Sequence, residues 1–297
     1  MILGKKTAVI IPAYNEQDFI VKTIKGVPAE IDVIVCVDDR STDATHAVML
    51  ARAQKEKRVI VMQTDQNGGI GHAVRTGFSR VIDEVDYVAV LPGDDQCDAS
   101  LIPKFVQMCE REGYHCVKGN RFMSGNDTTA MPQNRKIGNI VYSMLTKMVS
   151  GYYTLFDSQH GFCVIQTTVL KRVAMKSIRR DYLFDNSLWI VLNTVNARIG
   201  EMRSPVRYQG EISDVNYVRF VQASIQYFAI AFVWRLFKRY GHIHPVTVAL
   251  LMSAVLLIYS LWFHNGLLFL YGTIIGMWMF FFDYWCDPNA VYQRLRK

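Results

Sequence analysis

Two uncharged apolar runs near the C-terminus limit what this chain can fold into. Val246–Phe263 contains 18 residues and no charged side chain, and Leu267–Phe282 is a second such run after the turn-forming His264-Asn265-Gly266. A helix over the first run, at about 1.5 Å per residue, is about 27 Å long, close to the roughly 30 Å core of a bilayer. Both runs are apolar on every face, which predicts a transmembrane helical hairpin; a buried hairpin in a soluble domain is the alternative.

The charges around these runs predict an orientation. Arg235, Lys238 and Arg239 precede the first run, and Arg294, Arg296 and Lys297 follow the second. Because basic residues stay on the cytoplasmic side, both termini and the bulk of the chain are predicted to be cytoplasmic. Tyr217–Phe237 mixes apolar with polar residues and is interpreted as an amphipathic helix on the membrane surface; a helix that packs on the rest of the protein is the second interpretation.

Composition narrows the class of partner. The net charge of +7 suits nucleic acid, an anionic membrane surface or phosphorylated small molecules. The lysines and arginines are spread along the chain and partly juxtamembrane, so no nucleic-acid partner is predicted. The six cysteines are scattered without a CxxC pair, which predicts reduced and mostly buried thiols rather than a zinc site.

The first 210 residues alternate between short β-branched runs and helix-length segments. Strands are predicted at Thr7–Ile11, Asp32–Val37, Arg58–Met62, Tyr87–Leu91 and, more weakly, Cys116–Lys118, with helices at Asn15–Lys25, Asp43–Gln54, Gly71–Asp83 and Ser100–Glu112. This alternation is typical of an α/β fold with a mostly parallel sheet and helices on both faces. In such sheets ligands bind outside the carboxyl ends of the strands.

Polar clusters follow several of these strands. They are Pro12-Ala13-Tyr14-Asn15-Glu16, Asp38-Asp39-Arg40-Ser41-Thr42-Asp43 and Pro92-Gly93-Asp94-Asp95-Gln96. An acidic rim of this kind suits Mg²⁺ or Mn²⁺ bridging a diphosphate, because both ions prefer oxygen ligands and take few of them from protein side chains. Asp94 and Gln96 alternate along an extended turn and are predicted to face one ion; a solvated acidic turn is the alternative.

The usual nucleotide-binding loops do not fit. No GxxxxGK[ST] occurs, and the turn after the first predicted strand, PAYNE, has no glycine and so lacks the GxGxxG of dinucleotide folds. The glycine-rich Asn67–Gly71 follows the third predicted strand instead. Its glycines either form the turn that starts a helix or let the backbone, Gly71 included, approach a ligand.

Several motifs together carry a family resemblance. VIIPAYNE, VDDRSTD, NGGIGHAVRTGF, GDDQ, KGNRF, RKIGN and DSQHGF occur in this order between residues 5 and 215. In order and spacing the chain resembles a family 2 glycosyltransferase of the GT-A fold, and within that family the dolichyl-phosphate mannose synthase and polyprenyl-phosphate glycosyltransferase group. We therefore divide the chain into a catalytic domain (1–215), an amphipathic juxtamembrane helix (216–241), a transmembrane hairpin (242–285) and a basic cytoplasmic tail (286–297).

The resemblance, together with the acidic rim, predicts which residues form the site. Pro12, Tyr14, Glu16, Asp38, Asp39 and Gly71 are expected around the nucleoside, Arg207 in the phosphate region, Asp94 and Gln96 on the metal, Arg121 and Arg135 near the phosphates, and Asp157, Gln159 and His160 near the acceptor. There are two departures from the family pattern. Pro92 replaces the first Asp of DxD, so the metal shell either is weaker or is completed by Asp95, and Ile212-Ser213-Asp214 replaces a basic tail.

The chemistry explains these residue types. Glycosyl transfer breaks a sugar C1–O bond through an oxocarbenium-like transition state, while negative charge gathers on the leaving diphosphate. A metal on Asp94 and Gln96 would neutralise that charge, aided by arginines whose planar forks meet two phosphate oxygens at once. Asp94, Arg121, Arg135 and Asp157 are therefore the expected catalytic residues.

The acceptor decides whether a base is needed. A phosphate monoester has a second pKa of about 6 and is largely ionised at neutral pH, so it attacks without losing a proton. A hydroxyl acceptor would need a general base such as Asp157, which otherwise orients the acceptor loop or pairs with an arginine. Phe122–Asn134 is either a lid over the bound donor or an exposed loop.

These observations lead to a functional hypothesis. The chain is expected to be a membrane-attached inverting glycosyltransferase that moves a sugar from a UDP- or GDP-sugar to a polyprenyl phosphate, undecaprenyl or dolichyl, and a homo-oligomer is left open. The first alternative is transfer to a hydroxyl of a lipid-linked glycan. The second, motivated by Pro92, is a non-catalytic nucleotide-sugar binder.

Overall fold

A seven-stranded mixed sheet forms the centre of the protein. The computed structural model describes residues 1–124, 131–207, 217–241, 244–263 and 266–289, without the side chains of 134–135, 217–222 and 263. The strands are β1 (Thr7–Ala13), β2 (Val33–Asp38), β3 (Val59–Gln63), β4 (Tyr87–Val90), β5 (Cys116–Asn120), β6 (Cys163–Gln166) and β7 (Ile199–Arg203). Their order in the sheet is β3-β2-β1-β4-β6-β5-β7. The five predicted strands and four predicted helices are confirmed, with ends that differ by a few residues.

The prediction of a mostly parallel sheet is confirmed, with one antiparallel strand. β1, β2, β3 and β4 pair in parallel, as do β5 and β7, but β6 is antiparallel to both β4 and β5. The segment 151–162 returns to the edge of the sheet where β5 ends, and its Asp157 contacts Arg121 there. β6 therefore starts at that edge and runs in the opposite direction.

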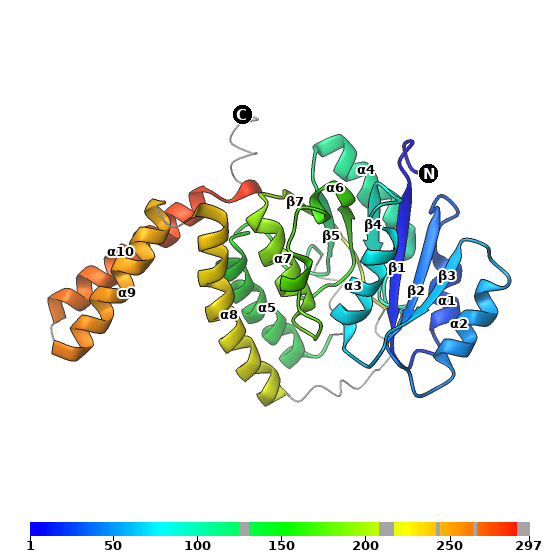
Figure 1. Ribbon diagram of the computed structural model, residues 1–297, viewed down its shortest axis with the longest axis horizontal. Helices are drawn as coiled ribbons and strands as arrows, with labels where there is room; N and C mark the ends of the chain where they lie inside the picture. The colour runs from blue at the N-terminus through cyan, green and yellow to red at the C-terminus, as the bar shows by residue number, and fades with distance from the viewer. Residues whose placement is uncertain (125–130, 208–216, 242–243, 264–265, 290–297) are drawn as a thin grey trace.

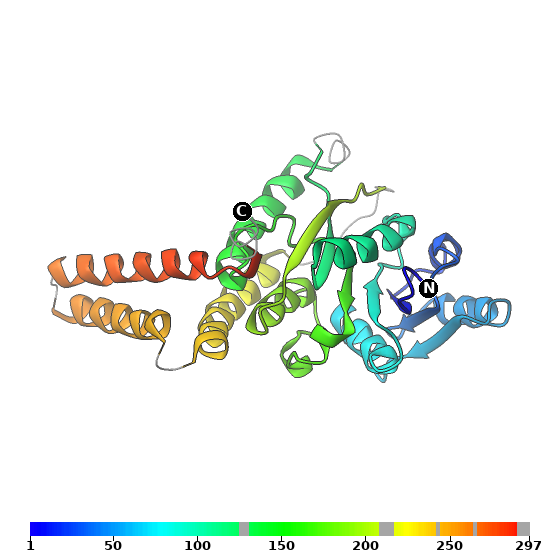
Figure 2. The same ribbon diagram turned by 90° about the horizontal axis from the view of Figure 1, so that it is seen from above.

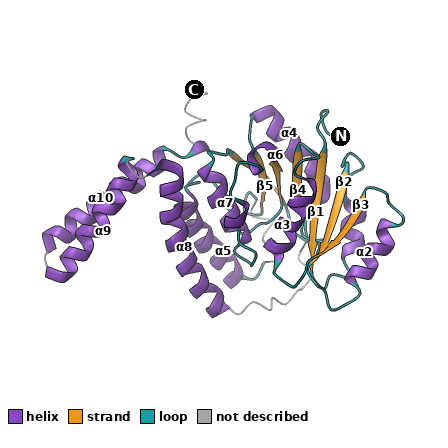
Figure 3. Cartoon of the chain, viewed as in Figure 1, coloured by secondary structure: helices purple, strands orange, loops and turns teal. Residues whose placement is uncertain are grey.

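Helices cover both faces of the sheet (Figures 1 and 3). They are α1 (Ile20–Gly26), α2 (Thr45–Ala53), α3 (Ile70–Val81), α4 (Ile102–Glu112), α5 (Gln133–Ser150), the short α6 (Thr167–Leu170) and α7 (Phe184–Thr194), with 3-10 turns at Ala99–Leu101 and Met175–Ser177. Successive strand residues point to opposite faces. Ile10 accordingly joins the core under α3 and α7, whereas Val9 and Ile11 join the core under α1 and α4. Burial of both faces explains why β1, β2 and β4 are largely apolar runs rather than alternating ones.

The C-terminal third is a helix followed by a hairpin that projects from the rest of the molecule (Figure 2). α8 (Tyr217–Tyr240) packs on α5 and α7, where its Phe228 and Ala231 meet Val149 and Ile190. α9 (Pro245–Phe263) and α10 (Gly266–Trp285) are both long and apolar enough to cross a membrane. Only 28% and 17% of these two spans is buried within the protein, which does not fit the alternative of a buried hairpin in a soluble domain.

A buried ion pair joins the hairpin to α8. Arg235 on α8 is fully buried and donates through Nη1 to Oδ1 of Asp283 at 3.0 Å and through Nη2 to Oδ2 at 2.7 Å. The hydroxyls of Tyr153 and Tyr240 donate to the same carboxylate, each at 2.8 Å. Arg235, which the sequence analysis counted among the basic residues that flank the first apolar run, is therefore a buried partner of Asp283, because the chain folds back and brings this acid from α10 to it.

The first residues after α10 also pack on the catalytic part. Oδ2 of Asp287 accepts from the backbone N–H of Tyr153 at 3.0 Å, and Asn289 bonds both the N–H and the carbonyl of Ile199 in the edge strand β7. Both side chains are buried. The base of the hairpin is thus tied to the sheet at several points, and the division between hairpin and basic tail near residue 285 stays a prediction.

We predict that Asp283→Asn destabilises the fold far more than removal of an exposed acid does. Loss of one partner leaves Arg235 buried without a counter-charge, and breaking a buried pair in this way costs about 3–5 kcal/mol. Asp83→Asn is the matched control, since Asp83 is exposed and pairs with Lys171 on the surface. The measurement is denaturant unfolding in detergent micelles; equal midpoints for the two variants would contradict the assignment.

Candidate active site

The nucleotide side of the site forms where β1 and β2 end. Asn15 has a left-handed backbone (φ 57°), and its Oδ1 accepts from the N–H of Thr42 at 2.8 Å. The N–H of Glu16 donates to Oγ1 of Thr45 at 2.8 Å. Pro12 is buried in β1, whereas the ring of Tyr14 is exposed on the rim. The PAYNE and VDDRSTD motifs therefore lie side by side, as expected for the carboxyl edge of a sheet.

The two aspartates at the end of β2, Asp38 and Asp39, are buried and accept hydrogen bonds. Asp38 accepts from Nε2 of Gln63 at 2.7 Å and from the N–H of Ser41 at 3.0 Å. Asp39 accepts from the N–H groups of Gly69 at 2.6 Å and Gly68 at 3.1 Å. Their carboxylates thus hold the rim loops together, and the expected contact of Asp39 with a base remains a prediction.

The glycine turn is shaped by close backbone packing. Gly69 has φ 88°, a conformation that L side chains rarely adopt, and it precedes the first residue of α3. A Cβ on Gly71 would lie 2.1 Å from the carbonyl oxygen of Arg179. The open side of Gly71 is therefore filled by the protein, which favours the interpretation as a helix-starting turn at this position.

The Asp94–Gln96 turn follows β4. Oδ1 of Asp94 accepts from the N–H of Gln96 at 3.1 Å, and the N–H of Arg207 donates to the carbonyl of Gln96 at 3.0 Å. Asp95 has a left-handed backbone (φ 55°) and forms an ion pair with Lys22 on α1. Asp95 would have to leave that ion pair to compensate for Pro92, so the structure gives this compensation no support.

The donor set of this turn fits a hard divalent ion that takes most ligands from elsewhere. Within the described residues no group of three or more His, Cys, Asp or Glu side chains could hold a metal. A carboxylate and an amide oxygen two residues apart match Mg²⁺ or Mn²⁺ completed by phosphate and water. Asp94 and Gln96 remain the candidate ligands, with the backbone of Arg207 beside them and its side chain exposed.

A buried ion pair forms the centre of the site. Arg121, directly after β5, donates through Nε to Oδ2 of Asp157 at 2.8 Å and through Nη2 to Oδ1 at 2.6 Å. Its backbone N–H also donates to Oδ2 at 2.8 Å. Asp157 is fully buried and adopts a left-handed backbone (φ 49°). This two-pronged geometry orients the guanidinium, and the structure thereby favours the pairing role of Asp157 over the base role.

The electrostatics agree with that role. Burial by itself would raise the pKa of Asp157, but the hydrogen bonds and charge of Arg121 outweigh it and hold the pKa well below its usual range. Asp157 is therefore ionised at neutral pH and holds no proton to exchange. His160 is buried, and its Nε2 lies 3.0 Å from Oγ of Ser204. Burial and the nearby charge of Arg121 lower the pKa of His160 to about 3, so the ring is neutral.

Lys118 is a site residue that the sequence interpretation missed. Its ammonium is fully buried and donates to the carbonyls of Asp157 and Gly119 at 2.8 Å each, next to Glu201 at 3.4 Å. It thereby fixes the DSQHGF segment against β5. The available signal was a lysine inside a strand of a sheet that is otherwise buried on both faces, since buried charges are normally paired.

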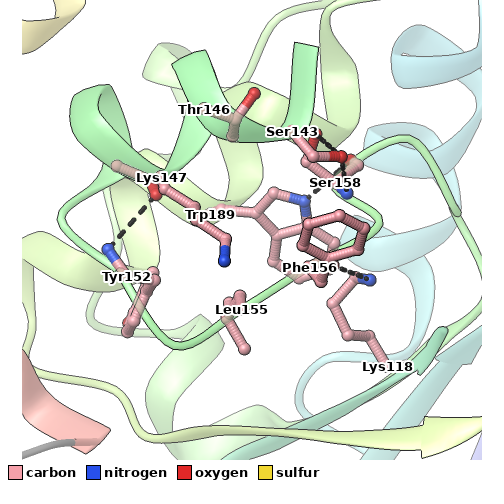
Figure 4. A pocket seen from close by; sticks show the side chains of 10 residues that line it. Lys118, Ser143, Thr146, Lys147, Tyr152, Leu155, Phe156, Ser158 and Trp189 are labelled. Atoms are coloured by element: carbon pink, nitrogen blue, oxygen red, sulfur yellow. Dashed lines mark hydrogen bonds between the residues drawn. The ribbon is translucent and has the colours of Figure 1, made fainter. Parts of the chain in front are cut away.

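A small cavity lies behind this segment (Figure 4). Its lining includes Lys118, Ser143, Ser158 and Trp189, drawn from β5, α5, the DSQHGF segment and α7. Its volume of about 10 Å³ matches a single water and excludes a sugar or a lipid chain. Nε1 of Trp189 donates to the carbonyl of Ser158 at 3.2 Å. The cavity is therefore part of the support for the site, not a ligand pocket.

The remaining predicted residues are placed only in part. Nε2 of Gln159 donates to Oδ1 of Asn186 at 2.8 Å, which ties the DSQHGF segment to α7. Arg135 lies in the first turn of α5, but its side chain is outside the described part of the chain. Residues 125–130 of the Phe122–Asn134 lid candidate and all of Ile212–Asp214 also lie outside it. Their assigned roles stay predictions.

Comparison with known proteins decides the family. The family described as Glycosyl transferase family 2 matches residues 8–174, more than half of the chain. The chain belongs to glycosyl transferase family 2. A crystal structure of glucosyl-3-phosphoglycerate synthase from Mycobacterium tuberculosis superposes with a TM-score of 0.53 at 16% identity, over 78% of this chain and 80% of that one. This likeness confirms the predicted GT-A fold.

Curated relatives confirm the resemblance to the polyprenyl-phosphate group. A UDP-N-acetylglucosamine–dolichyl-phosphate N-acetylglucosaminyltransferase of Methanococcus voltae is 27% identical over 207 residues, 65% of this chain and 82% of the relative. An undecaprenyl-phosphate 4-deoxy-4-formamido-L-arabinose transferase of Edwardsiella ictaluri is 29% identical over 152 residues, 49% of this chain and 46% of the relative.

We predict that Asp157 contributes mainly to the stability of the fold and to the position of Arg121, and does not act as a base. We expect Asp157→Asn to cost about 3–5 kcal/mol of unfolding free energy by stranding Arg121, and to lower transfer whatever the acceptor is. An additional Arg121→Gln should add much less than its own single effect, since the two side chains act as a unit. Unfolding and kcat/KM are measured for both singles and the double variant.

The pH dependence of stability and of the transfer rate distinguishes the pairing role of Asp157 from the base role. Because the folded-state pKa of Asp157 is depressed, its stabilisation is present above pH of about 4 and is lost as the pH falls through the folded-state pKa. Asp157 should therefore produce no limb in the pH–rate profile between pH 5 and 8. A limb in that range that disappears in Asp157→Asn, with unchanged stability, would restore the base role.

Proposed function

We propose that this family 2 glycosyltransferase is attached to a membrane and transfers a sugar, with inversion, from a UDP- or GDP-sugar to a polyprenyl phosphate. The observation that carries the proposal is the position of α5 between the site and the outside. On its inner side Oγ of Ser143 accepts from the N–H of Ser158 at 3.0 Å, and Oγ1 of Thr146 accepts from Nδ2 of Asn186 at 2.7 Å. Its outer side is apolar and exposed.

The outer side of α5 forms one continuous stripe. Its members are Ile137, Val141, Met144, Leu145 and Met148, all at least 44% exposed. Spacings of three and four residues put them on one helix face. Ile225 and Ile230 of the neighbouring α8 are exposed as well. An apolar surface of this kind, beside a hairpin that fits a bilayer, suits contact with lipid.

The two faces of α5 support a lipid phosphate as the acceptor. A helix that meets lipid on one face and the DSQHGF segment on the other brings the site to the level of the membrane surface, where the phosphate of a polyprenyl lipid lies. The names of the Methanococcus voltae and Edwardsiella ictaluri relatives support a dolichyl or undecaprenyl phosphate acceptor. The proposed orientation places the catalytic part and both termini in the cytoplasm, supported by the exposed Lys238 and the basic C-terminal tail.

The reaction uses the site as follows. An oxygen of the lipid phosphate forms a bond to C1 of the sugar from the face opposite the nucleoside diphosphate, and the C1–O bond to the diphosphate breaks. Asp94 and Gln96 would hold Mg²⁺ or Mn²⁺, which supplies positive charge to the leaving diphosphate. Arg121, oriented by Asp157, adds a fixed cation in a buried setting, where charge stabilisation is strongest. The acceptor is already ionised and needs no base.

Metal-dependent transfer to lipid is the primary test. Purified protein in detergent is offered radiolabelled UDP- and GDP-sugars with undecaprenyl or dolichyl phosphate, with Mg²⁺ or Mn²⁺ and then with EDTA. Labelled lipid should appear only with metal, and Asp94→Asn should lower kcat/KM by at least tenfold. Asp98→Asn is the matched control, since Asp98 caps the 3-10 turn after the site and asparagine caps equally well. Donor binding without labelled lipid would reject the phosphate acceptor and favour a glycan hydroxyl.

The lipid contact of α5 makes a separate prediction. Val141→Lys places a charge in the apolar stripe and should lower transfer to polyprenyl phosphate in vesicles by several-fold, because burying a lysine at the interface is unfavourable. Transfer to a short, water-soluble prenyl phosphate should be unchanged. Gln54→Lys, at the exposed end of α2, is the control for added charge. Equal losses with both acceptors would indicate a defect in the site and contradict the lipid contact.

A further inference from the structure

Asp185 is a carboxylate near the site that the mechanism above does not use. It lies in the first turn of α7, and its Oδ1 is shielded from solvent without a hydrogen-bond partner among the described residues. The neighbouring acids differ from it in this respect. Asp157 is bound by Arg121, and Glu201 accepts from Asn120 at 3.0 Å and from the N–H of Phe156 at 2.9 Å. A buried acceptor left without a donor is costly, so this position calls for an explanation.

Asp185 lies against the DSQHGF segment, and its neighbours in the chain pack on the glycine turn and on that segment. Its carboxylate rests on Gly161 of the DSQHGF motif, since a Cβ on that glycine would lie 3.3 Å from Oδ1 and 3.5 Å from Oδ2. The preceding residue, Phe184, packs on Gly71 of the glycine turn, where a Cβ would lie 2.9 Å from the Cβ of Phe184. The following residue, Asn186, is held by Gln159 and Thr146. The turn that carries Asp185 is thus fixed from both sides.

The charge of Asp185 restricts what it can bind. A carboxylate repels both the diphosphate of the donor and the phosphate of the acceptor, so neither is expected against it. The part of the substrates that lies between them is the sugar, which is neutral at its hydroxyls and donates hydrogen bonds. Burial raises the pKa of Asp185 to about 7 despite the nearby charges of Lys118 and Arg121. Hydroxyl donors would favour its ionised form and remove the cost of leaving it unpaired.

We propose that Asp185 accepts hydrogen bonds from hydroxyl groups of the transferred sugar and thereby selects the donor. The inference rests on the proposed function, because it needs a nucleoside-diphosphate sugar in the site. A site that hydrogen-bonds a substrate hydroxyl discriminates strongly against sugars that lack it, since the buried acceptor is then left unpaired. Asp185 is in this view a specificity-determining residue, and the acceptor phosphate still attacks without a base.

The test compares the nucleoside diphosphate with its sugar conjugate. Dissociation constants are measured by calorimetry with Mg²⁺ for wild type, Asp185→Asn and Asp185→Ala, using the donor identified in the transfer assay and the matching nucleoside diphosphate. Both variants should weaken donor binding by at least tenfold and leave nucleoside diphosphate binding unchanged. Asp181→Asn is the matched control, because Asp181 lies four residues earlier and pairs with Arg179 at a half-exposed position.

Deoxy donors supply a second measurement. A donor that lacks the hydroxyl bound by Asp185 should lose as much kcat/KM with wild type as Asp185→Asn loses with the full donor, and the variant should show no further loss with that analogue. The unpaired carboxylate makes no bond within the described residues, so Asp185→Asn should unfold at the wild-type denaturant concentration or above it. This result separates a lost contact from a misfolded variant.

Three outcomes would overturn the assignment. Equal weakening of nucleoside diphosphate and donor would place Asp185 on the nucleotide, and a lower kcat with unchanged donor affinity would make it a base. Loss of stability in Asp185→Asn would make it structural. Failure of the proposed function would be recognised separately, because wild-type protein would then bind no nucleoside-diphosphate sugar or label no lipid.

Discussion

The buried pair between Arg121 and Asp157 is the interaction on which the rest of the site depends. A guanidinium can act on a phosphate only if its position is fixed before the substrate arrives, since a mobile cation would lose its advantage to reorganisation. Asp157 provides that fixation through both prongs of the fork, and Lys118 fixes Asp157 through its carbonyl. The cost of burying these charges is offset because each is paired and hydrogen-bonded. The same pair lies at the edge of the sheet where β5 ends and from which β6 runs in the opposite direction.

Much of the fold of the catalytic part was predictable from the sequence, because its first strands and helices are specified by short, local runs of residues. β1 to β4 are short apolar runs separated by helix-length segments, and the clusters at their ends fall on one edge as expected for parallel strands. The direction of β6 was not predictable in this way. Its four residues, Cys163–Gln166, carry no sign of direction, which depends on where residues 151–162 return. At that return Asp157 contacts Arg121, a residue 36 positions earlier in the chain.

Charged residues were the least reliable part of the sequence interpretation, and for one physical reason. A sequence shows that a residue has a charge but not which partner it will meet. Arg235 was counted as one of the basic residues before a membrane span and is a buried partner of Asp283. Lys118 was assigned no role of its own, and its ammonium holds the DSQHGF segment. Asp157 permitted two roles until its partner was known. By contrast, the feature that singles out Asp185 is visible only in the structure, where its Oδ1 is buried without a donor among the residues that the structure describes.

The hairpin and the site are mechanically continuous, and this follows from how the C-terminal helices are attached. Arg235 and Asp283 join α8 to α10, Asp287 and Asn289 join the end of α10 to the segment before the acceptor motif and to β7, and α8 packs on α5. α5 in turn contacts Ser158 and Asn186. On the proposed function, a lipid phosphate must reach this site while its chain stays in the bilayer. The contacts that connect the hairpin to the DSQHGF segment would then hold the site at a constant height above the bilayer, so that the phosphate could meet the sugar without extraction of the lipid.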